Sequence, residues 1–382
     1  MKKILFRKLL SDYLTFFFLT LISTTIVIWV FQAVNFLDIM IEDGRDYLVY
    51  INYSLLNFPK ILSRIFPFVL FFSLFYITSK YELNNELIIF WSFGVQKIEI
   101  INFIFRVSIL LMLLQMILTS HFVPKSQDQA RSFLRTSTIN FFGNFIKPQR
   151  FNDTIKGVTI YADKKDDKGN LDNLYLKREF ENNQFQITYA KKGEFIEKGN
   201  APVLVLYQGA TLTSRNNKIT NISFSKSDFS LSNIETNTTT YKKTQEISSF
   251  KILQCINNFF NLKKKKFDEK SKNIENCSLA NIDNIFKEFY KRFIIPIYIP
   301  ILSIIPFLLL VLSKENNRYQ KLKFTTFLIG LFIIIFSETT IRFISNNFLQ
   351  NMFIILIPFL LGLFLYLYFI FKFTFNYKNI QS

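Results

Sequence analysis

The sequence predicts an α+β membrane protein in which two groups of three transmembrane helices flank one inserted antiparallel β-jelly-roll domain. Hydrophobic residues make up 50% of the 382 positions, and they are concentrated in the two ends of the chain. The middle of the chain is one polar insert with short alternating runs, a pattern typical of antiparallel strands. We therefore expect helices one to three in 1–123, the β domain with flanking helical segments in 124–292, and helices four to six in 293–382.

Six stretches are long and apolar enough to cross a bilayer, whose hydrocarbon core needs roughly 20 residues of helix. The expected spans are Tyr13–Leu37, Ile61–Ser79, Ile101–Val123, Phe293–Leu312, Phe324–Ile344 and Met352–Phe371. The first run is longer than the roughly 7–15 residues of a signal-peptide core, and no small-residue cleavage site follows it. We therefore expect the first span to be retained.

The short loops predict the orientation, because Lys and Arg favour the cytoplasmic side. These residues are frequent in the N-terminal segment, in the loop 313–323 and in the C-terminal tail, whereas the segments 38–57 and 345–351 contain almost none. Both termini are therefore expected in the cytoplasm. The β domain is expected in the periplasm, since long domains translocate largely regardless of their own charge.

The β domain is expected between about Phe151 and Leu231. Alternating runs such as Val203–Tyr207 and Ile219–Phe224 are separated there by turn residues. We count about eight strands in about 100 residues, a density typical of a sandwich or jelly roll.

The segments that flank the β domain, 124–145 and 245–292, look helical and lead from span three and into span four. Cys255 and Cys277 lie in the second flank, outside the predicted core of the insert. A disulfide is chemically allowed in an exported segment. Because both cysteines lie outside that core, we expect two free thiols.

No residue pattern indicates catalysis, a cofactor or a metal site. His121 is the only histidine, and the sequence gives it no clustered partners for a metal or a catalytic triad. No Gly-x-x-x-x-Gly-Lys-Ser/Thr loop occurs, so the sequence has no P-loop nucleotide site. The formal charge of +18 comes without a nucleic-acid reader motif, so no nucleic-acid partner is expected. Energy-driven work would therefore need a partner or a gradient.

The segment between spans two and three, 81–94, reads Tyr-Glu-Leu-Asn-Asn-Glu-Leu-Ile-Ile-Phe-Trp-Ser-Phe-Gly and predicts an amphipathic helix. Glu86 lies near its start, and Gly94 is the expected C-terminal cap. Such a helix is suited to docking into a groove on a partner. The alternative is an interfacial helix that lies among the lipid headgroups.

The motif Glu-Leu-x-x-(apolar)-x-(small)-x-Gly that begins at Glu86 resembles the coupling helix of the LptF/LptG permeases of the lipopolysaccharide export system. The resemblance covers nearly the whole chain, as three spans, an exported jelly roll and three spans. Phe122–Pro124 and Gln129–Arg131 resemble the family's exit from span three. Ile146–Phe151 and Gly157–Tyr161 look like the start of its jelly roll, and more like LptF than LptG.

The resemblance implies a permease subunit of the bacterial inner membrane. It would extract lipopolysaccharide and pass it to a periplasmic bridge, driven by a separate ATPase. The implied partners are a homologous LptG-like six-span permease, a dimeric LptB-like ABC ATPase, a single-span LptC-like bridge protein and a periplasmic LptA-like protein. In the family the helix with the position of Glu86 sits in the ATPase groove, which implies ATPase contacts for Glu86, Leu87, Phe90, Trp91 and Gly94.

The family likeness also implies a lateral lipid gate formed by spans one and five. Relatives often carry a basic residue near the outer end of span one, where this chain has Gln32, Asn35 and Phe36 instead. In span five, Glu338 and Arg342 lie one turn apart and have the favourable order for an ion pair within the helix. The functional alternative is that Arg342 contacts a lipid phosphate, because its planar fork binds phosphate with two hydrogen bonds.

Two other functions fit the same pattern of spans. One is an exporter of another lipid or of a lipoprotein. The other is a non-transporting membrane scaffold or sensor whose exported β domain binds a partner. Six spans are more than an anchor needs, and a scaffold gives the helix at 81–94 no role. Lipopolysaccharide export is therefore the leading hypothesis.

Overall fold

The protein folds into two compact units. The computed structural model describes residues 2–37, 47–133, 146–155, 158–166, 170–180, 184–198, 201–215, 218–230, 242–261 and 274–375. We call the first unit the helical unit; it contains Met1–Val30, Leu56–Asp128 and Tyr241–Ser382. The second, the β unit, contains Phe31–Leu55 and Gln129–Thr240.

Six helical stretches within the described residues are long and apolar enough to cross a membrane, which confirms the expected 3 + 3 arrangement. Each is longer than the roughly 20 residues that a bilayer core requires. They contain α1 (Lys2–Asn35), α3 (Tyr47–Leu56) with α4 (Phe58–Leu83), α6 (Lys97–Ile117) with α7 (Val123–Ser132), α11 (Ile282–Phe293) with α12 (Tyr298–Ile304), α13 (Tyr319–Thr339) and α14 (Phe348–Ile370).

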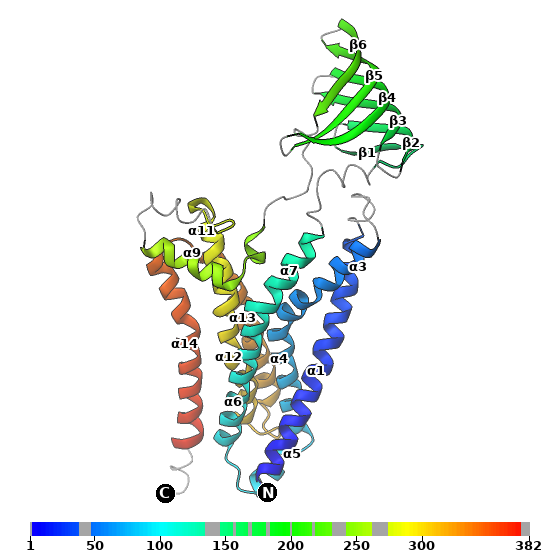
Figure 1. Ribbon diagram of the computed structural model, residues 1–382. Coiled ribbons are helices and arrows are strands. Elements are labelled where there is room, and N and C mark those ends of the chain that lie inside the picture. The colour runs from blue at the N-terminus through cyan, green and yellow to red at the C-terminus, as the bar shows by residue number, and fades with distance from the viewer. Residues whose placement is uncertain are drawn as a thin grey trace. The chain divides into compact units, whose positions relative to one another are not determined.

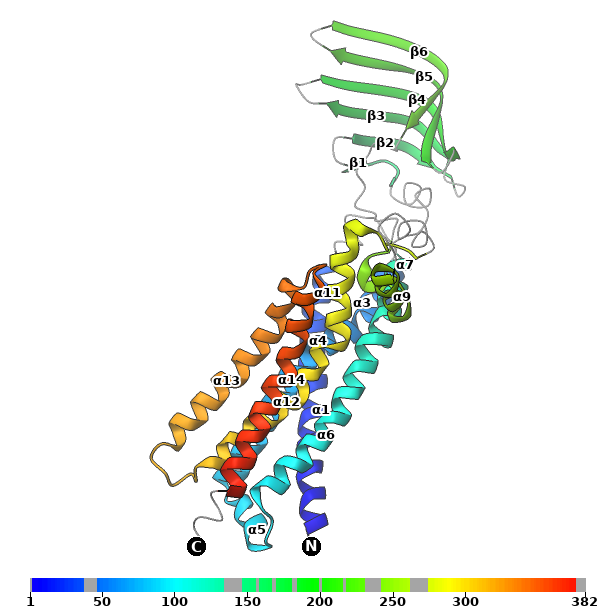
Figure 2. The ribbon, with the colours of Figure 1, turned by 90° about the vertical axis from the view of Figure 1, so that its left-hand side faces the viewer.

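The helical unit has two distinct ends (Figures 1 and 2). The first, which we call the α5 end, carries the beginning of α1, the short helix α5 (Glu86–Ser92) and the end of α14. The second, the α9 end, carries α7, α9 (Ser249–Asn261) and the beginning of α11. Helix α9 lies across the direction of the spans rather than along it (Figure 1).

The fourth span is interrupted because it contains three prolines. Helices α11 and α12 are joined by a 3₁₀ turn at Ile295–Ile297, and a second 3₁₀ segment, Ile305–Val311, follows α12. Pro296, Pro300 and Pro306 lack the N–H that continues an α-helix. This span is also the most buried one, at 83% of its apolar segment against 17% for the first and the sixth. Other helices therefore cover the irregular backbone.

Proline also frees a carbonyl in α4, and a side chain from another helix satisfies it. Pro67 lies inside α4 and has no N–H to donate to Ser63 O, four residues earlier. Gln115 of α6 donates its Nε2 to Ser63 O at 2.7 Å, in a buried position. Because a buried carbonyl without a donor is costly, this hydrogen bond fixes α6 against α4.

The same arrangement recurs at the break in the fourth span. Arg292 O lies four residues before Pro296, and Thr119 Oγ1 donates to it at 2.9 Å. Thr119 belongs to a π-helical turn, Leu118–Phe122, that links α6 to α7. Two irregular helical segments therefore meet where each has backbone groups to satisfy.

Helices α4 and α13 approach closely because α13 carries a glycine at the contact. A Cβ atom at Gly330 would lie 2.0 Å from the ring of Phe71 in α4. Phe71, Phe72 and Phe75 of α4 all contact Phe327 of α13, with ring centroids 5.5–6.4 Å apart. The glycine thus allows the fifth span to lie against the second.

The β unit contains an antiparallel sheet, as the sequence predicts. Within the described residues it has six strands, which are hydrogen-bonded in their sequence order. The strands are β1 (Phe151–Ile155), β2 (Val158–Lys165), β3 (Leu171–Phe180), β4 (Gln184–Lys198), β5 (Ala201–Arg215) and β6 (Lys218–Ser230). Figures 1 and 2 show that this sheet is strongly curved.

The structure describes six strands where the sequence led us to expect about eight, because two strands are unusually long. Strands β4 and β5 have 15 residues each. Val203–Tyr207, which looks like a complete strand in the sequence, is only the first part of β5. The backbone of Gln208 has a φ of 53°, and the next residue, Gly209, leaves no room for a Cβ beside Tyr189 O. The strand therefore continues through an irregular position instead of ending there.

The alternation of residues gives the sheet one apolar face and one mixed face. The apolar face holds the core of the β unit: Val158, Ile160, Ala162, Leu171, Leu174, Leu176, Ala190, Leu204 and Leu206, with Ile146 packed on them. On the opposite face, aromatic rings from four neighbouring strands contact one another in a row: Phe151, Tyr161, Tyr175 and Tyr189. Such cross-strand pairs stabilise an antiparallel sheet.

The flanking segments are partly helical, and one expectation about them is wrong. Helix α7 covers the beginning of the first flank, and the rest of that flank, from 134 to 145, lies outside the described residues. In the second flank, Cys255 of α9 and Cys277 form a disulfide rather than two free thiols. Both cysteines are buried in a core shared by α9 and α11. That core forms only when the two helices pack together, so it is not visible as a continuous apolar run.

Arg292 anchors the segment that leads into α9. Its side chain is only 1% exposed, and its Nε donates to Glu288 Oε1 at 2.9 Å. The two terminal nitrogens of Arg292 donate to Gln245 O, Ile247 O and Ser249 Oγ. A buried guanidinium is tolerated only when it is paired and its donors are satisfied. This cluster therefore fixes the start of α9 against the end of α11.

The bond between Gln115 and Ser63 can be tested with a double-mutant cycle. We expect Gln115→Leu to lower the free energy of unfolding by about 1 kcal/mol, because Ser63 O loses its donor. In a Pro67→Ala background the N–H of residue 67 can donate to Ser63 O. Gln115→Leu is then expected to lower the free energy of unfolding by a smaller amount. The measurement is the free energy of unfolding of the four proteins in detergent micelles. If Gln115→Leu lowers the free energy of unfolding equally in both backgrounds, the hydrogen bond from Gln115 to Ser63 O does not compensate for Pro67.

Candidate functional site

Helix α5 is shorter than the sequence predicts, because residues 81–83 still belong to α4. Asn85 has a φ of 62° and separates the two helices. Gly94, with a φ of 68°, ends α5 as expected. Gly94 N donates to Trp91 O, and Val95 N donates to Phe90 O, both at 3.0 Å. This pair of bonds is the Schellman motif, which stops a helix at a residue of positive φ.

The faces of α5 divide the expected ATPase-contact residues. Leu87 is 4% exposed and Phe90 is 3% exposed, and both pack into the core of the helical unit. Phe90 contacts the ring of Phe6 in α1 and that of Tyr81 in α4. These two side chains of α5 therefore hold the helix to its own protein and are not available to a partner in this structure.

Three other apolar side chains of this segment lie on the surface: Ile88, Ile89 and Phe93. Ile88 is 58% exposed, although it is adjacent to buried Leu87. Glu86 is half-buried at the start of α5, where Asn84 Nδ2 donates to Glu86 Oε1 at 3.2 Å. The available surface of α5 thus combines a carboxylate with an apolar patch. The amphipathic pattern indicates two faces, but only the packing shows which one is covered.

Lys97, which the sequence did not single out, connects α5 to the second half of the chain. Its Nζ donates to Leu310 O at 2.6 Å, at the end of the fourth span. The same ammonium lies 5.8 Å from the ring centre of Trp91 and 5.5 Å from that of Phe373. Cation–π contacts of this kind are attractive. The only sequence signal was a lysine at the start of the helix that forms the third span.

A second connection lies on the other side of α5. Glu82 Oε1 accepts a hydrogen bond from Lys314 N at 3.1 Å, and Lys314 Nζ donates to Leu83 O at 3.1 Å. Lys314 belongs to the segment between the fourth and fifth spans. The residues before and after α5 are therefore both bonded to the half of the chain that contains spans four to six.

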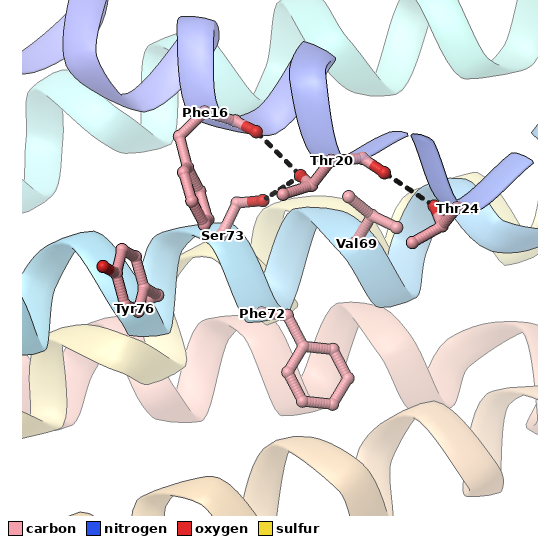
Figure 3. A pocket seen from close by; sticks show the side chains of 7 residues that line it. All are labelled: Phe16, Thr20, Thr24, Val69, Phe72, Ser73 and Tyr76. Atoms are coloured by element: carbon pink, nitrogen blue, oxygen red, sulfur yellow. Dashed lines mark hydrogen bonds between the residues drawn. The ribbon is translucent and has the colours of Figure 1, made fainter. Parts of the chain in front are cut away.

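A groove of about 330 Å³ lies between the first and second spans. Its lining combines aromatic and small polar side chains: Phe16, Thr20, Thr24, Val69, Phe72, Ser73 and Tyr76. In Figure 3, Thr20 and Ser73 face each other across the two helices, and their hydroxyl oxygens are 3.1 Å apart. The hydroxyl of Thr20 also lies within hydrogen-bond distance of Phe16 O. This lining suits an apolar chain, because the hydroxyls of Thr20, Thr24 and Ser73 already have partners.

The gate residues expected in span one lie at the end of α1 that belongs to the β unit. Gln32 is half-buried and Asn35 is exposed. The half-buried ring of Phe36 contacts that of Tyr53, with centroids 5.0 Å apart. Glu338 and Arg342 belong to the helical unit instead. The expected gate residues of span one and those of span five therefore belong to different units.

The expected ion pair between Glu338 and Arg342 is not formed. Helix α13 ends at Thr339, and Arg342 lies in a following 3₁₀ turn, Thr340–Phe343. The tighter turn removes the helical spacing on which the i,i+4 pairing depends. Both charged side chains are exposed, and no salt bridge joins them. Arg342 is thus available to a ligand.

The described part of the chain contains no group of three His, Cys, Asp or Glu side chains that could hold a metal ion. His121 lies in the π-helical turn after α6, and its ring contacts that of Phe122. The functional features of the helical unit are therefore a surface helix at its α5 end and an apolar groove within the spans.

Six spans around a polar insert, with a short helix exposed between spans two and three, are the features of a multi-pass membrane protein. The family model of the lipopolysaccharide export system permease LptF/LptG matches residues 7–372. The chain therefore belongs to this family, whose members are permease components of lipopolysaccharide export. The match covers LptF and LptG together, so the expected closer likeness to LptF stays a prediction.

A curated relative has almost the same length as this chain. It is the "Uncharacterized protein RP871" of Rickettsia prowazekii (strain Madrid E). The two sequences are 25% identical over 358 residues, which cover 90% of this chain and 91% of the relative. The similarity thus includes both groups of spans and the insert between them.

We predict that Lys97 keeps α5 in place. Lys97→Met removes the donor to Leu310 O. Hydrogen exchange of the backbone amides of 86–96 is then expected to become about fivefold faster, because the free energy of local opening falls by about 1 kcal/mol. Lys97→Arg keeps a cationic donor and is expected to restore protection. Lys321→Met, at an exposed position, is the matched control. Unchanged exchange in Lys97→Met would show that the contact does not hold the helix.

Proposed function

We propose that this chain is a permease subunit of an ABC exporter that extracts lipopolysaccharide from the inner membrane. A separate dimeric ATPase of the LptB type supplies the energy, and a homologous six-span permease of the LptG type completes the membrane part. The lipid passes to a periplasmic bridge formed by LptC-like and LptA-like proteins. Membership of the lipopolysaccharide export permease family is the observation that carries this proposal.

The coupling contact is assigned to α5. A groove on the ATPase receives the exposed surface formed by Glu86, Ile88, Ile89 and Phe93. The apolar side chains supply contact area, and Glu86 supplies a charge at the beginning of the helix. Leu87 and Phe90, which are buried, pass the displacement of α5 to α1 and α4 through their packing. Gly94 ends α5 at a fixed position.

The cargo has long acyl chains, so its route needs apolar surfaces. The groove between the first two spans supplies such a surface in the helical unit. We assign Arg342 to a contact with a lipid phosphate, because its guanidinium is exposed and has no ion-pair partner at Glu338. Gln32, Asn35 and Phe36 remain our candidates for the gate at the end of span one.

The proposed orientation places the α5 end in the cytoplasm and the α9 end on the periplasmic side. Lys and Arg are frequent in the short segments at the α5 end, which favours the cytoplasm. The Cys255–Cys277 disulfide lies at the α9 end and supports the same orientation, because disulfides persist in oxidising compartments such as the periplasm.

Replacement of Glu86 tests the coupling contact. We expect Glu86→Ala to reduce the ATPase that co-purifies with the tagged chain by about tenfold or more, as for the loss of at least about 1.4 kcal/mol. Its thermal stability should not change, because Glu86 is only half-buried. Glu315→Ala, at an exposed acidic residue of the loop between spans four and five, is the control and should retain the ATPase.

Normal ATPase recovery with Glu86→Ala would contradict the role of α5. Mass spectrometry of the proteins that co-purify with the unmodified chain tests the wider proposal. An ABC ATPase and a second six-span permease are expected in fixed proportion. Recovery of the chain with a signalling protein and no ATPase would favour the scaffold hypothesis instead.

Cysteine labelling tests the orientation. In a background of Cys255→Ser and Cys277→Ser, a single cysteine is introduced by Glu315→Cys or by Asn346→Cys, both at exposed positions. A membrane-impermeant maleimide added to spheroplasts should label the cysteine at position 346. The cysteine at position 315 should react only after the membrane is opened. The reverse pattern would place the α5 end outside the cytoplasm.

A further inference from the structure

A second apolar cavity, separate from the groove in the first two spans, lies at the α9 end. It has a volume of about 220 Å³ and is lined mainly by α9, α11 and α14. Its walls are formed by Ile256 and Phe260 of α9, Phe286 and Phe289 of α11, and Met352 and Ile355 of α14. The proposed function gives this cavity no role.

The polar side chains at the cavity do not favour water. Tyr290 Oη is 3.0 Å from Thr340 Oγ1 and forms a hydrogen bond with it. Asn351 Oδ1 accepts from Ser345 N at 3.2 Å, and Asn351 Nδ2 donates to Ser345 O at 2.7 Å. A buried water needs two to four polar partners. Because these groups are already paired, the cavity is suited to an apolar occupant.

The cavity opens toward the surface that faces lipid. Met352 and Phe260, at its rim, are both about half exposed. Leu349, Phe353 and Leu356 continue this exposed apolar surface along α14, which is one of the membrane spans. Hydrocarbon chains of the bilayer therefore surround the opening.

Helix α9 has the pattern of a helix that lies in the membrane interface. It runs across the spans at their ends (Figure 1). One side packs on α11, an adjacent side exposes Leu253 and Phe260, and Phe250 is exposed at the start of the helix. Polar side chains such as Lys251 and Gln254 occupy the remaining surface. Apolar residues toward the acyl chains and polar residues toward water are typical of an interfacial helix.

The roof of the cavity is held in place at several points. The disulfide joins Cys255, one residue before the wall residue Ile256, to Cys277. Ser249 Oγ donates to Ser120 O, which lies four residues before Pro124, a residue that has no N–H to donate. With the bonds of Arg292 to the start of α9, these contacts keep the cavity formed when it is empty.

An ion-pair cluster braces the turn that carries Cys277. Lys242 Nζ lies 3.2 Å from Asp128 Oδ2 and 3.4 Å from Glu275 Oε2. Burial lowers the pKa of Lys242, but the hydrogen bond to Asp128 and the charges of Asp128 and Glu275 raise it more, so the pKa lies above the ordinary lysine value. Lys242 therefore stays charged and links this turn to α7 at neutral pH.

We propose that this cavity binds one acyl chain of a membrane phospholipid, with α9 as a fixed interfacial roof. The opening lies in the hydrocarbon layer, where phospholipid chains are the most abundant apolar groups, so even a weak affinity leads to occupancy. The volume fits part of a single chain and not the several chains of lipopolysaccharide. The second chain of the phospholipid remains in the bilayer.

Photochemical labelling of the full chain in lipid nanodiscs tests the proposal. The probe is a phosphatidylethanolamine with a diazirine in one acyl chain, diluted into unlabelled phosphatidylethanolamine and phosphatidylglycerol. Mass spectrometry is expected to find the label on peptides that contain Ile256 and Phe286. Ile355→Trp fills the cavity and is expected to reduce this labelling several-fold. Leu356→Trp, at the adjacent lipid-facing position, is the control and should leave it unchanged.

Two results would overturn the proposal. The first is equal labelling of the cavity peptides in Ile355→Trp and in Leu356→Trp, which would indicate contact with bulk lipid only. The second is displacement of the probe by added lipopolysaccharide, which would identify cargo rather than phospholipid as the occupant. If Ile355→Trp does not fold, Ile256→Phe fills the cavity from the opposite wall and is read in the same way. Because no ATPase is needed, the result is independent of the proposed export function.

Discussion

The packing of the helical unit depends on one constraint: a hydrocarbon interior offers no hydrogen-bond partner to a free backbone carbonyl. Prolines within the spans create such carbonyls, and side chains from other helices satisfy them. Gln115 donates a hydrogen bond to Ser63 O in this way, and Thr119 donates one to Arg292 O. Each of these bonds fixes a pair of helices at one depth. The prolines therefore determine where helices meet, in addition to where they bend.

The same constraint explains why the first three spans and the last three spans pack into one helical unit. The break in the fourth span places Arg292 O beside the third span, and Leu310 O, at the end of the following 3₁₀ segment, accepts from Lys97. A regular fourth helix would pair most of these carbonyls internally. Its irregular backbone instead binds to the first half near both ends. This span is also the most buried of the six, as its backbone requires.

The sequence predicted the features that depend on local pattern and missed those that depend on packing. Span number follows from length and composition, and the end of α5 follows from Gly94, which tolerates a positive φ. Within the described residues the number of strands did not follow, because β5 continues through Gln208 beyond Val203–Tyr207, the run that looks like a complete strand in the sequence. The disulfide was missed because its cysteines meet only when α9 and α11 pack. The role of Lys97 likewise depends on a contact with Leu310, which is 213 positions away in the chain.

The short length of α5 bears on how a partner would act on the permease. Isolated helices below about 12–15 residues are marginal in water, so the 7 residues of α5 are held mainly by tertiary contacts. Leu87 and Phe90 tie α5 to the first two spans, and Lys97 ties the segment after it to the fourth and sixth. A force on α5 thus reaches both halves of the chain at once. The α9 end is held by a disulfide and by Arg292, so a movement of α5 would have to be absorbed between the two ends. The π-helical and 3₁₀ segments there are the places where helices bend most readily.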